Sequence, residues 1–383
     1  MLKKIAVIAS SVVLSFSANA ALSADLERTM VWTSYDLGSS GYAEASAIGN
    51  ALQEEKETRI RIVPSGTSVG RILPLTTGKA KYGFLANEVF FATEAMHEFS
   101  DPSWGPQDLR IVMGRPAVNG LAVAADAGVK TISDLRDKRV GYVKGNPSVN
   151  VKTDAQLAYG GLTRKDVDVV FFGSYSAMGP AMEAGQIDAR NAVPSSSVVR
   201  EMEASSRGLY WPAYDPKDTK AWEAVRAITD FQSPVLSGNG AGLSEDKPVW
   251  LMGYRYPMIT TYAQTSQEDV YQLVKAIDET YDVFKNATSG SSEWAVTKAL
   301  RTPMDAPIHD GAVRYAKEKG IWTEEDQAWQ DARLVRLEKT KRLWDEAQAA
   351  FNEIRIEKKE KGVKVDIQSE WPVFWQEYRD KNS

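Results

Sequence analysis

Short apolar runs alternate with amphipathic stretches in the first part of the chain. This pattern predicts strands and helices in alternation, over residues 29–33, 42–52, 60–64, 69–77 and 82–85. Such an alternation is typical of α/β winding on a parallel sheet. We therefore expect a first α/β lobe in this part of the chain.

A second series of the same kind begins near residue 117. The pattern predicts strands over residues 120–125, 140–143 and 167–172, and helices that begin after Ser133, Ser148 and Ser174. We interpret this series as a second lobe with the same architecture.

A longer apolar and aromatic stretch over residues 250–263 has β character. It suits a strand that carries the chain back to the first lobe, and helices over residues 268–284 and 310–318 would complete that lobe. No other stretch after the amino terminus is long and apolar enough to be read as a membrane span.

Residues 323–360 are charged and helical. Leu337, Trp344 and Phe351 recur every seven residues, with Ala347 and Ile354 beside them, and form one apolar stripe on a long helix. A coiled coil usually sustains three to four heptads, whereas this stripe covers only about three. We expect the stripe to dock on its own protein, which favours a monomer, and dimerisation is the alternative.

The amino terminus has the three-part order of a secretory signal. Lys3 and Lys4 precede an apolar run over residues 5–16, and Ala20 ends a segment of small residues. A run of about a dozen apolar residues is too short for a membrane helix, which needs roughly 20. We expect export to the periplasm with cleavage after Ala20.

The composition excludes several kinds of site. The 383 residues include no cysteine, which excludes disulfides, thiolate metal sites and a cysteine nucleophile. The only histidines are His97 and His309, and the acidic residues lack the spacing of a calcium loop, so we expect no metal and no cofactor. A formal net charge of -5 argues against nucleic acid as a partner.

Small polar loops follow the predicted strands, at the edge where open α/β sheets bind ligands. The helix amino termini that open there expose unpaired N–H groups, which favour a carboxylate. The candidate ligand-binding residues are Ser39, Ser40, Gly41, Tyr42, Gly66, Thr67, Ser68, Arg71, Asn87, Asn146, Ser148, Asn150, Ser174 and Tyr175. Ser and Gly also cap helices and make turns, so a purely structural role is the alternative.

Three charged side chains near these loops could contact a ligand. Arg71 follows Ser68 by three residues and could grip a carboxylate in a bidentate fork, unless it is a solvated surface arginine. Glu44 and Glu88 could pair with a ligand ammonium, which would favour an amino acid. The alternative is that they are a helix amino-terminal charge and a loop charge.

A hydrolase is the rival interpretation. Gly66-Thr67-Ser68-Val69-Gly70 fits the Gly-x-Ser-x-Gly pattern of a nucleophile elbow between a strand and a helix. Ser68 would then need a histidine and an acid close in space, and His309 could complete the chain order serine, acid, histidine. We expect a binding protein and no enzyme, with a serine esterase as the alternative.

Several motifs in one order resemble the TAXI-type receptors of tripartite ATP-independent periplasmic (TRAP) transporters, over roughly residues 30–322. They include Gly38-Ser39-Ser40-Gly41-Tyr42, Val63-Pro64-Ser65-Gly66-Thr67-Ser68-Val69 and Gly78-Lys79-Ala80-Lys81-Tyr82-Gly83-Phe84. Further along come Ile132-Ser133-Asp134-Leu135, Ala184-Gly185-Gln186-Ile187-Asp188-Ala189 and Pro307-Ile308-His309-Asp310-Gly311. Each motif alone is weak, and the ordered set carries the resemblance.

The resemblance implies an α/β, two-lobed periplasmic binding protein of type II, a Venus flytrap whose lobes close on a ligand. We divide the chain into five segments. Residues 1–20 are the signal peptide, residues 21–116 and 226–322 are the two parts of lobe I, residues 117–225 are lobe II, and residues 323–383 are a C-terminal helical extension. The extension goes beyond the family core.

The resemblance also implies a function. A small carboxylate, such as an organic acid or an acidic amino acid like glutamate or 2-oxoglutarate, would be captured and delivered to integral membrane TRAP subunits. A periplasmic sensory module of the same fold is a further alternative.

Overall fold

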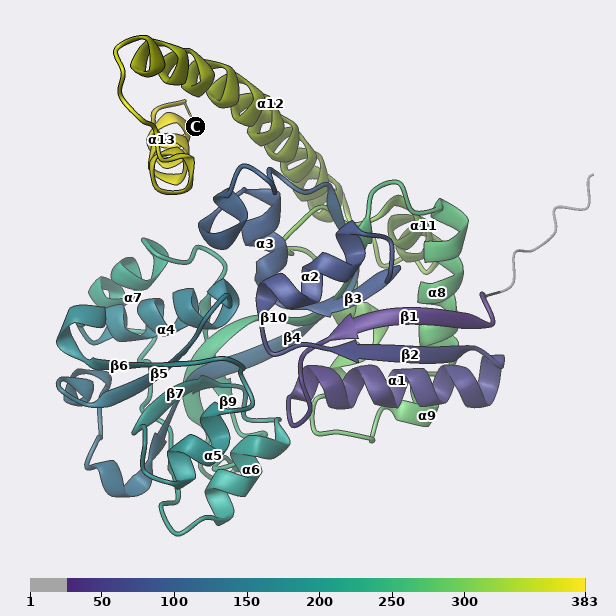
Figure 1. The fold of residues 1–383 in the computed structure, drawn as a ribbon. Coiled ribbons are helices and arrows are strands. Elements are labelled where there is room, and N and C mark those ends of the chain that lie inside the picture. Colours follow the sequence, from purple (N-terminus) through teal and green to yellow (C-terminus); the bar gives the residue numbers. More distant parts are fainter. Residues whose placement is uncertain (1–25, 383) are drawn as a thin grey trace, which may run out of the picture.

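The computed structural model describes residues 26–382, and within them ten strands form one mixed sheet that runs through two lobes (Figure 1). The strand order is β2-β1-β3-β10-β4-β7-β5-β6, with β8 beside β4 and β9 beside β10. The predicted two-lobed α/β fold with C-terminal helices is confirmed. The predicted signal peptide lies outside the described residues.

Lobe I begins with parallel strands, each followed by a helix, as the pattern predicted. The elements are β1 (Thr29–Ser34), α1 (Ser40–Lys56), β2 (Arg59–Pro64), α2 (Ser68–Thr76), β3 (Tyr82–Leu85) and α3 (Glu88–Thr93). Ser39 caps α1 by accepting the Tyr42 N–H, and Thr67 caps α2 by accepting the Gly70 N–H. The polar loops therefore fix where both helices begin.

Lobe II repeats this winding. Its elements are β5 (Arg139–Val143), α4 (Pro147–Tyr159), β6 (Asp168–Phe172), α5 (Met178–Glu183), β7 (Ala189–Ala192), α6 (Ser197–Ala204), β8 (Leu209–Tyr210) and α7 (Thr219–Arg226). The helix expected after Ser133 is the short 3-10 turn Ile132–Leu135.

Two long antiparallel strands cross between the lobes. β4 (Leu109–Ala124) pairs with β10 (Val249–Tyr262), and β9 (Ser233–Ser237) pairs with the first half of β10. The prediction placed β10 within one residue at each end, but found only the last third of β4. Its earlier part carries Gly114 and Pro116, which weaken a strand pattern.

The rest of lobe I consists of helices after β10: α8 (Gln267–Glu279), α9 (Tyr281–Phe284), α10 (Val296–Ala299) and α11 (Asp310–Glu318). One helix was predicted where α8 and α9 lie. The Thr280 hydroxyl donates to the Ala276 carbonyl at 2.8 Å, and the residue leaves helical geometry with φ −96° and ψ 4°. This side-chain bond competes with the backbone ladder and divides the helix.

Each lobe has its own hydrophobic core. The first is built around Trp32, Phe84 and Trp294, and the second around Tyr142 and Met178. Phe231 packs against both cores.

The C-terminal extension is a helical hairpin of α12 (Glu324–Glu360) and α13 (Ile367–Asn382), seen at the top of Figure 1. The predicted stripe on α12 docks within the chain, because Trp344 packs edge-on against Trp371 and Trp375 of α13, with ring centroids 4.8 and 4.9 Å apart. The sequence pattern did not predict α13, which contains Pro372. No helix in the described part of the chain combines the length and apolarity that a membrane span requires.

Candidate functional site

The candidate site is the interlobe interface, where the loops after β1, β2 and β3 of lobe I meet the loops after β5 and β6 of lobe II. Val69 N donates to Gly145 O at 3.3 Å, and Tyr175 N donates to Gly66 O at 3.3 Å. The two sets of predicted loops are therefore in direct contact, with the lobes closed on one another.

Ser68 and Asn146 connect the lobes at the centre of this interface. The Ser68 hydroxyl donates to Asn146 Oδ1 at 2.8 Å, and Asn146 Nδ2 donates to Gly66 O at 2.9 Å. Ser68 and Asn146 are both fully buried. The structure thus brings together three of the predicted residues from two lobes.

A buried ion pair lies beside them. Arg71 Nε is 2.7 Å from Glu88 Oε1, and both side chains are fully shielded from solvent. The other Glu88 oxygen accepts the hydroxyl of Ser148 from lobe II. Burial acts to raise the pKa of Glu88, but the Arg71 charge together with hydrogen bonds from Arg71, Ser148 and the Ala86 backbone outweighs it, so the pKa lies below its usual value.

Arg71 has no nitrogen left over for a ligand in this arrangement. Its Nη1 donates to Ser65 O at 3.0 Å and its Nη2 donates to Ser68 Oγ at 3.2 Å, besides the Nε bond to Glu88. The carboxylate that Arg71 binds here is therefore that of Glu88. The predicted contact between Arg71 and a ligand stays a prediction.

A second polar chain crosses the interface through Asn87. Lys152 Nζ donates to Asn87 Oδ1 at 2.9 Å, and Asn87 Nδ2 donates to Asp305 Oδ2 at 2.8 Å. All three side chains are nearly or fully buried. Burial lowers the pKa of Lys152 to about 7 and raises the pKa of Asp305 to about 6, because each charged form loses water.

Aromatic rings fill the interface near the first helix. The Gly41 N–H donates to the Tyr256 hydroxyl at 3.3 Å, and the Tyr35 ring contacts those of Tyr256 and Tyr175, with centroids 5.4 and 5.7 Å away. Ser40 is buried beside Gly41. The loop that opens α1 therefore contacts Tyr256 of the crossing strand β10, and the Tyr35 ring links Tyr256 to Tyr175 of lobe II.

Several predicted residues have local structural roles. Ser39 and Thr67 are helix caps, and Tyr42 is the residue whose N–H Ser39 caps. Both ends of the Asn150 amide bond to the Val143 backbone, at 2.9 and 2.8 Å, which fixes α4 against β5. Ser174 Oγ lies 3.3 Å from Ser176 Oγ within lobe II.

Sequence reasoning missed Lys152, Arg190 and Tyr256, all buried at or next to the interface. The signal for Arg190 was present, because a charged residue in the short strand β7 is unusual unless it is paired or functional. Lys152 and Tyr256 gave no local signal, since their position depends on how the lobes meet. Glu44 was considered only as a ligand contact or a helix charge, and it pairs with Arg115, with Oε2 2.6 Å from Nε.

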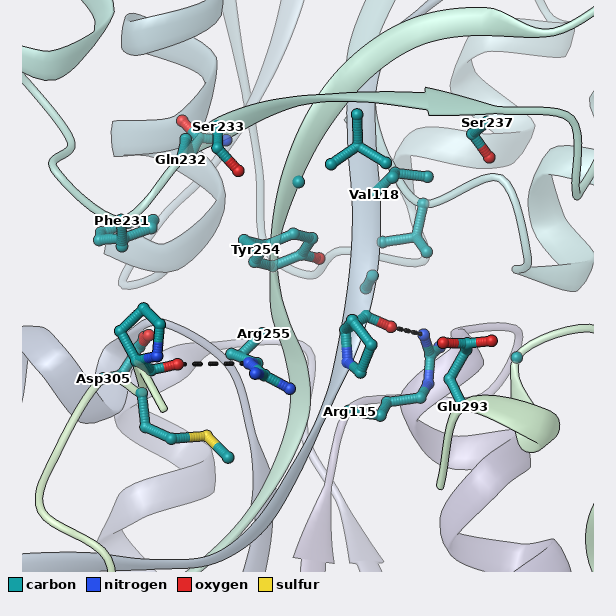
Figure 2. A pocket seen from close by; sticks show the side chains of 18 of the residues that line it. Arg115, Val118, Phe231, Gln232, Ser233, Ser237, Tyr254, Arg255, Glu293 and Asp305 are labelled. Atoms are coloured by element: carbon teal, nitrogen blue, oxygen red, sulfur yellow. Dashed lines mark hydrogen bonds between the residues drawn. The ribbon is translucent and has the colours of Figure 1, made fainter. Parts of the chain in front are cut away.

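A cavity of about 740 Å³, the hinge pocket, lies on the crossing strands between the lobes (Figure 2). Its floor is formed by 115–118 of β4 and 253–255 of β10. Figure 2 shows Gln232, Ser233 and Ser237 on one side of Tyr254 and Asp305 and Glu293 on the other. Both lobes form its walls, so its shape depends on the angle between them.

The hinge pocket has a basic wall. Arg255 donates to the Pro303 carbonyl at 3.3 Å, and Arg333 and Arg336 of α12 both contact Glu94. Burial lowers the pKa of Arg255 to about 10. Tyr254 lies here, with its ring centroid 4.3 Å from Lys152 Nζ.

Ser68 lacks the partners of a catalytic serine. Its hydroxyl bonds to Asn146 and Arg71, whereas His309 Nδ1 accepts the Gly311 N–H at 3.2 Å and its Nε2 faces Thr265 O at 3.0 Å. His97 packs edge-on against Phe91. No Ser-His-acid triad is assembled, and no group of three metal-ligating side chains occurs between residues 26 and 382.

Two α/β lobes joined by crossing strands, with buried polar side chains between them, form the two-lobed fold of periplasmic binding proteins. The model of the NMT1-like family matches residues 37–320, and the chain belongs to that family. The match covers both lobes and ends before α12.

Solved structures of similar architecture include the alkanesulfonate-binding protein SsuA from Xanthomonas axonopodis pv. citri, bound to MOPS. It is 16% identical, with a TM-score of 0.44, over 77% of this chain and 92% of that one. An amino acid ABC transporter substrate-binding protein from Streptococcus pneumoniae, bound to L-arginine, is 13% identical, with a TM-score of 0.41 over 70% and 93%. A putative L-cystine ABC transporter from Listeria monocytogenes is 10% identical, with a TM-score of 0.40 over 71% and 98%.

Proposed function

We propose that the protein is an exported periplasmic receptor that captures a small carboxylate between its lobes and delivers it to a membrane transporter. The observation that carries the proposal is the interlobe interface, where fully buried polar residues of both lobes, such as Ser68, Glu88, Asn146 and Ser148, meet at the ends of the strands. A ligand that contacts both lobes there favours the closed state.

The contacts between the lobes contribute to closure by themselves. A hydrogen bond inside a protein adds about 0.5–1.5 kcal/mol net, so the few bonds across this interface amount to a modest bias. Such a bias would let a ligand of small size complete the closure. The division of the lobes near residues 117 and 225 belongs to the same proposal.

The resemblance to TAXI-type receptors supports an organic acid or an acidic amino acid, such as glutamate or 2-oxoglutarate, as the ligand, and TRAP subunits as the partner. A sensory module of the same fold would differ from a transport receptor in its protein partner. Capture of the integral membrane subunits by the exported protein supports transport, whereas capture of a receptor kinase alone supports sensing.

The test is a thermal-shift screen of mature protein that has been unfolded, stripped of ligand and refolded. Glutamate, 2-oxoglutarate, succinate and lactate are compared with the uncharged amides succinamide and lactamide. A ligand that binds only the folded protein raises the melting temperature by mass action. We expect a rise with at least one carboxylate and none with its amide; no rise with any carboxylate would contradict the proposal.

A further inference from the structure

Arg190 is a fully buried cation, and no carboxylate between residues 26 and 382 is hydrogen-bonded to it. It lies on β7, where it pairs in register with Ala122 and Gly141, and its exposed fraction is 0%. Its Nε, Nη1 and Nη2 make no hydrogen bond with any residue between 26 and 382. Buried polar groups are normally hydrogen-bonded, so a buried guanidinium with no hydrogen bond needs a physical explanation.

The other buried cations near the interface all have partners. Arg71 pairs with Glu88, and Arg115 pairs with Glu44. Lys152 reaches Asp305 through Asn87. Arg190 therefore leaves one positive charge uncompensated in the interior beside the interface.

The one neighbour that stabilises the charge is an aromatic ring. Arg190 Cζ lies 4.4 Å from the centroid of Tyr175. A cation–π contact contributes roughly 0.5–2 kcal/mol, whereas moving a charge out of water costs several kcal/mol even after the protein relaxes. A guanidinium also stays protonated throughout the physiological pH range, so it does not escape this cost by losing its proton. The contact alone does not offset the burial.

The ring of Tyr175 separates Arg190 from lobe I. The Tyr175 ring that covers it contacts Tyr35 of lobe I, with centroids 5.7 Å apart. A Cβ added to Gly179 would lie 3.5 Å from Arg190 Nη1 and 2.3 Å from Val198, whose own N–H donates to Gly38 O of lobe I at 3.4 Å. Only glycine fits at residue 179, which keeps the backbone close to the guanidinium.

We infer that Arg190 anchors the ligand by a single carboxylate, which supplies the missing negative charge between β7 and the Tyr175 loop. The inference rests on the proposed function and deepens it, because it names the residue on lobe II that recognises the anion. The planar guanidinium offers two parallel N–H donors to a carboxylate. A ligand that carries one uncompensated negative charge neutralises the site.

The test uses the variant Arg190→Met, which keeps much of the side-chain volume and removes the charge. We expect the ligand-free protein to melt at the same temperature as wild type or higher, because an uncompensated buried charge is lost. The carboxylate that shifts wild type should bind at least about 30-fold more weakly, as for other buried charge pairs that lose one member. Arg200→Met, on exposed positions of α6, is the matched control and should change neither quantity.

The outcomes separate the two proposals. If wild type binds a carboxylate and Arg190→Met binds it equally well, the proposed contact between Arg190 and the ligand is wrong, while the proposed receptor function remains. If the ligand-free variant melts at a clearly lower temperature and keeps its ligand shift, Arg190 is structural and the inference is overturned. If wild type binds no carboxylate, the proposed function fails, and the anchor with it.

Discussion

Arg71 and Glu88 form an ion pair that excludes solvent completely, and the second oxygen of Glu88 takes the Ser148 hydroxyl from the opposite lobe. The pair lies within lobe I, but it presents an oriented carboxylate to lobe II. We interpret Arg71 as the residue that positions Glu88 for this interlobe contact.

Breaking this pair should destabilise the protein strongly. Arg71→Met leaves the Glu88 carboxylate buried with a hydroxyl as its remaining side-chain partner, which we expect to lower the free energy of unfolding by about 3–5 kcal/mol. Urea denaturation measures the change, and Arg61→Met on an exposed position of β2 is the control. The opposite sign for Arg71→Met and Arg190→Met would distinguish a paired from an unpaired buried arginine.

Removing an interlobe hydrogen bond should favour the open state. Ser148→Ala deprives Glu88 of its donor from lobe II, at a cost of about 1–3 kcal/mol to the closed arrangement. We expect a larger radius of gyration by X-ray scattering in the ligand-free protein and weaker ligand binding. Ser205→Ala removes a hydroxyl that bonds to Met202 O within lobe II and should leave both unchanged. Identical scattering of Ser148→Ala and wild type would argue against an interlobe role.

Stability should rise with pH above neutrality. Burial lowers the pKa of Lys152 from its ordinary value of 10.5 to about 7, in spite of the nearby Glu88 and Asp305. Between these two values the unfolded chain binds more protons than the folded one, so raising the pH stabilises the fold. Asp305 acts with the opposite sign at lower pH, because its pKa is raised from 3.8 to about 6 and stability falls across that interval.

Thermal denaturation from pH 5 to pH 9 checks this expectation. Lys152→Met should remove the increase above pH 7, whereas Lys165→Met, on an exposed turn of lobe II, should retain it. An unchanged pH profile in Lys152→Met would show that Lys152 keeps its ordinary pKa in the folded protein.

The C-terminal hairpin should undock locally when its aromatic cluster is broken. The Trp371 indole N–H donates to Ser100 O at 2.7 Å, and its ring packs against Trp344 and Phe351. Trp371→Ala should cost about 3–5 kcal/mol of this packing. Hydrogen exchange should accelerate in α13 and the end of α12 but not in the lobes. Val373→Ala, at an exposed site of the same helix, is the control, and global acceleration in Trp371→Ala would contradict a local role.

The sequence predicted the elements of both lobes because their signals are local. The caps Ser39 and Thr67 and the small loops after each strand mark where helices begin, whatever the rest of the chain does. The prediction failed where the outcome depends on distant packing. α13 is one case, since its buried Trp371 and Trp375 face residues that lie far earlier in the chain.

The sequence predicted which loops form the candidate site, but it did not predict which residues their side chains contact. Asn146 and Asn150 are both buried near the start of α4, yet the first reaches lobe I and the second turns back to Val143. The rotation of the helix decides between these outcomes, and no local pattern reports it. Arg190 was missed although a charged residue in so short a strand is a signal, because its role depends on whether a carboxylate lies nearby in the folded protein.

The hinge pocket gives the protein a use as an optical sensor. Its walls come from both lobes, and Ser237 of β9 lines it (Figure 2). Because the chain contains no cysteine, the variant Ser237→Cys would carry one thiol for a single environment-sensitive dye. Because both lobes line the hinge pocket, we expect the emission of the dye to change with the angle between the lobes.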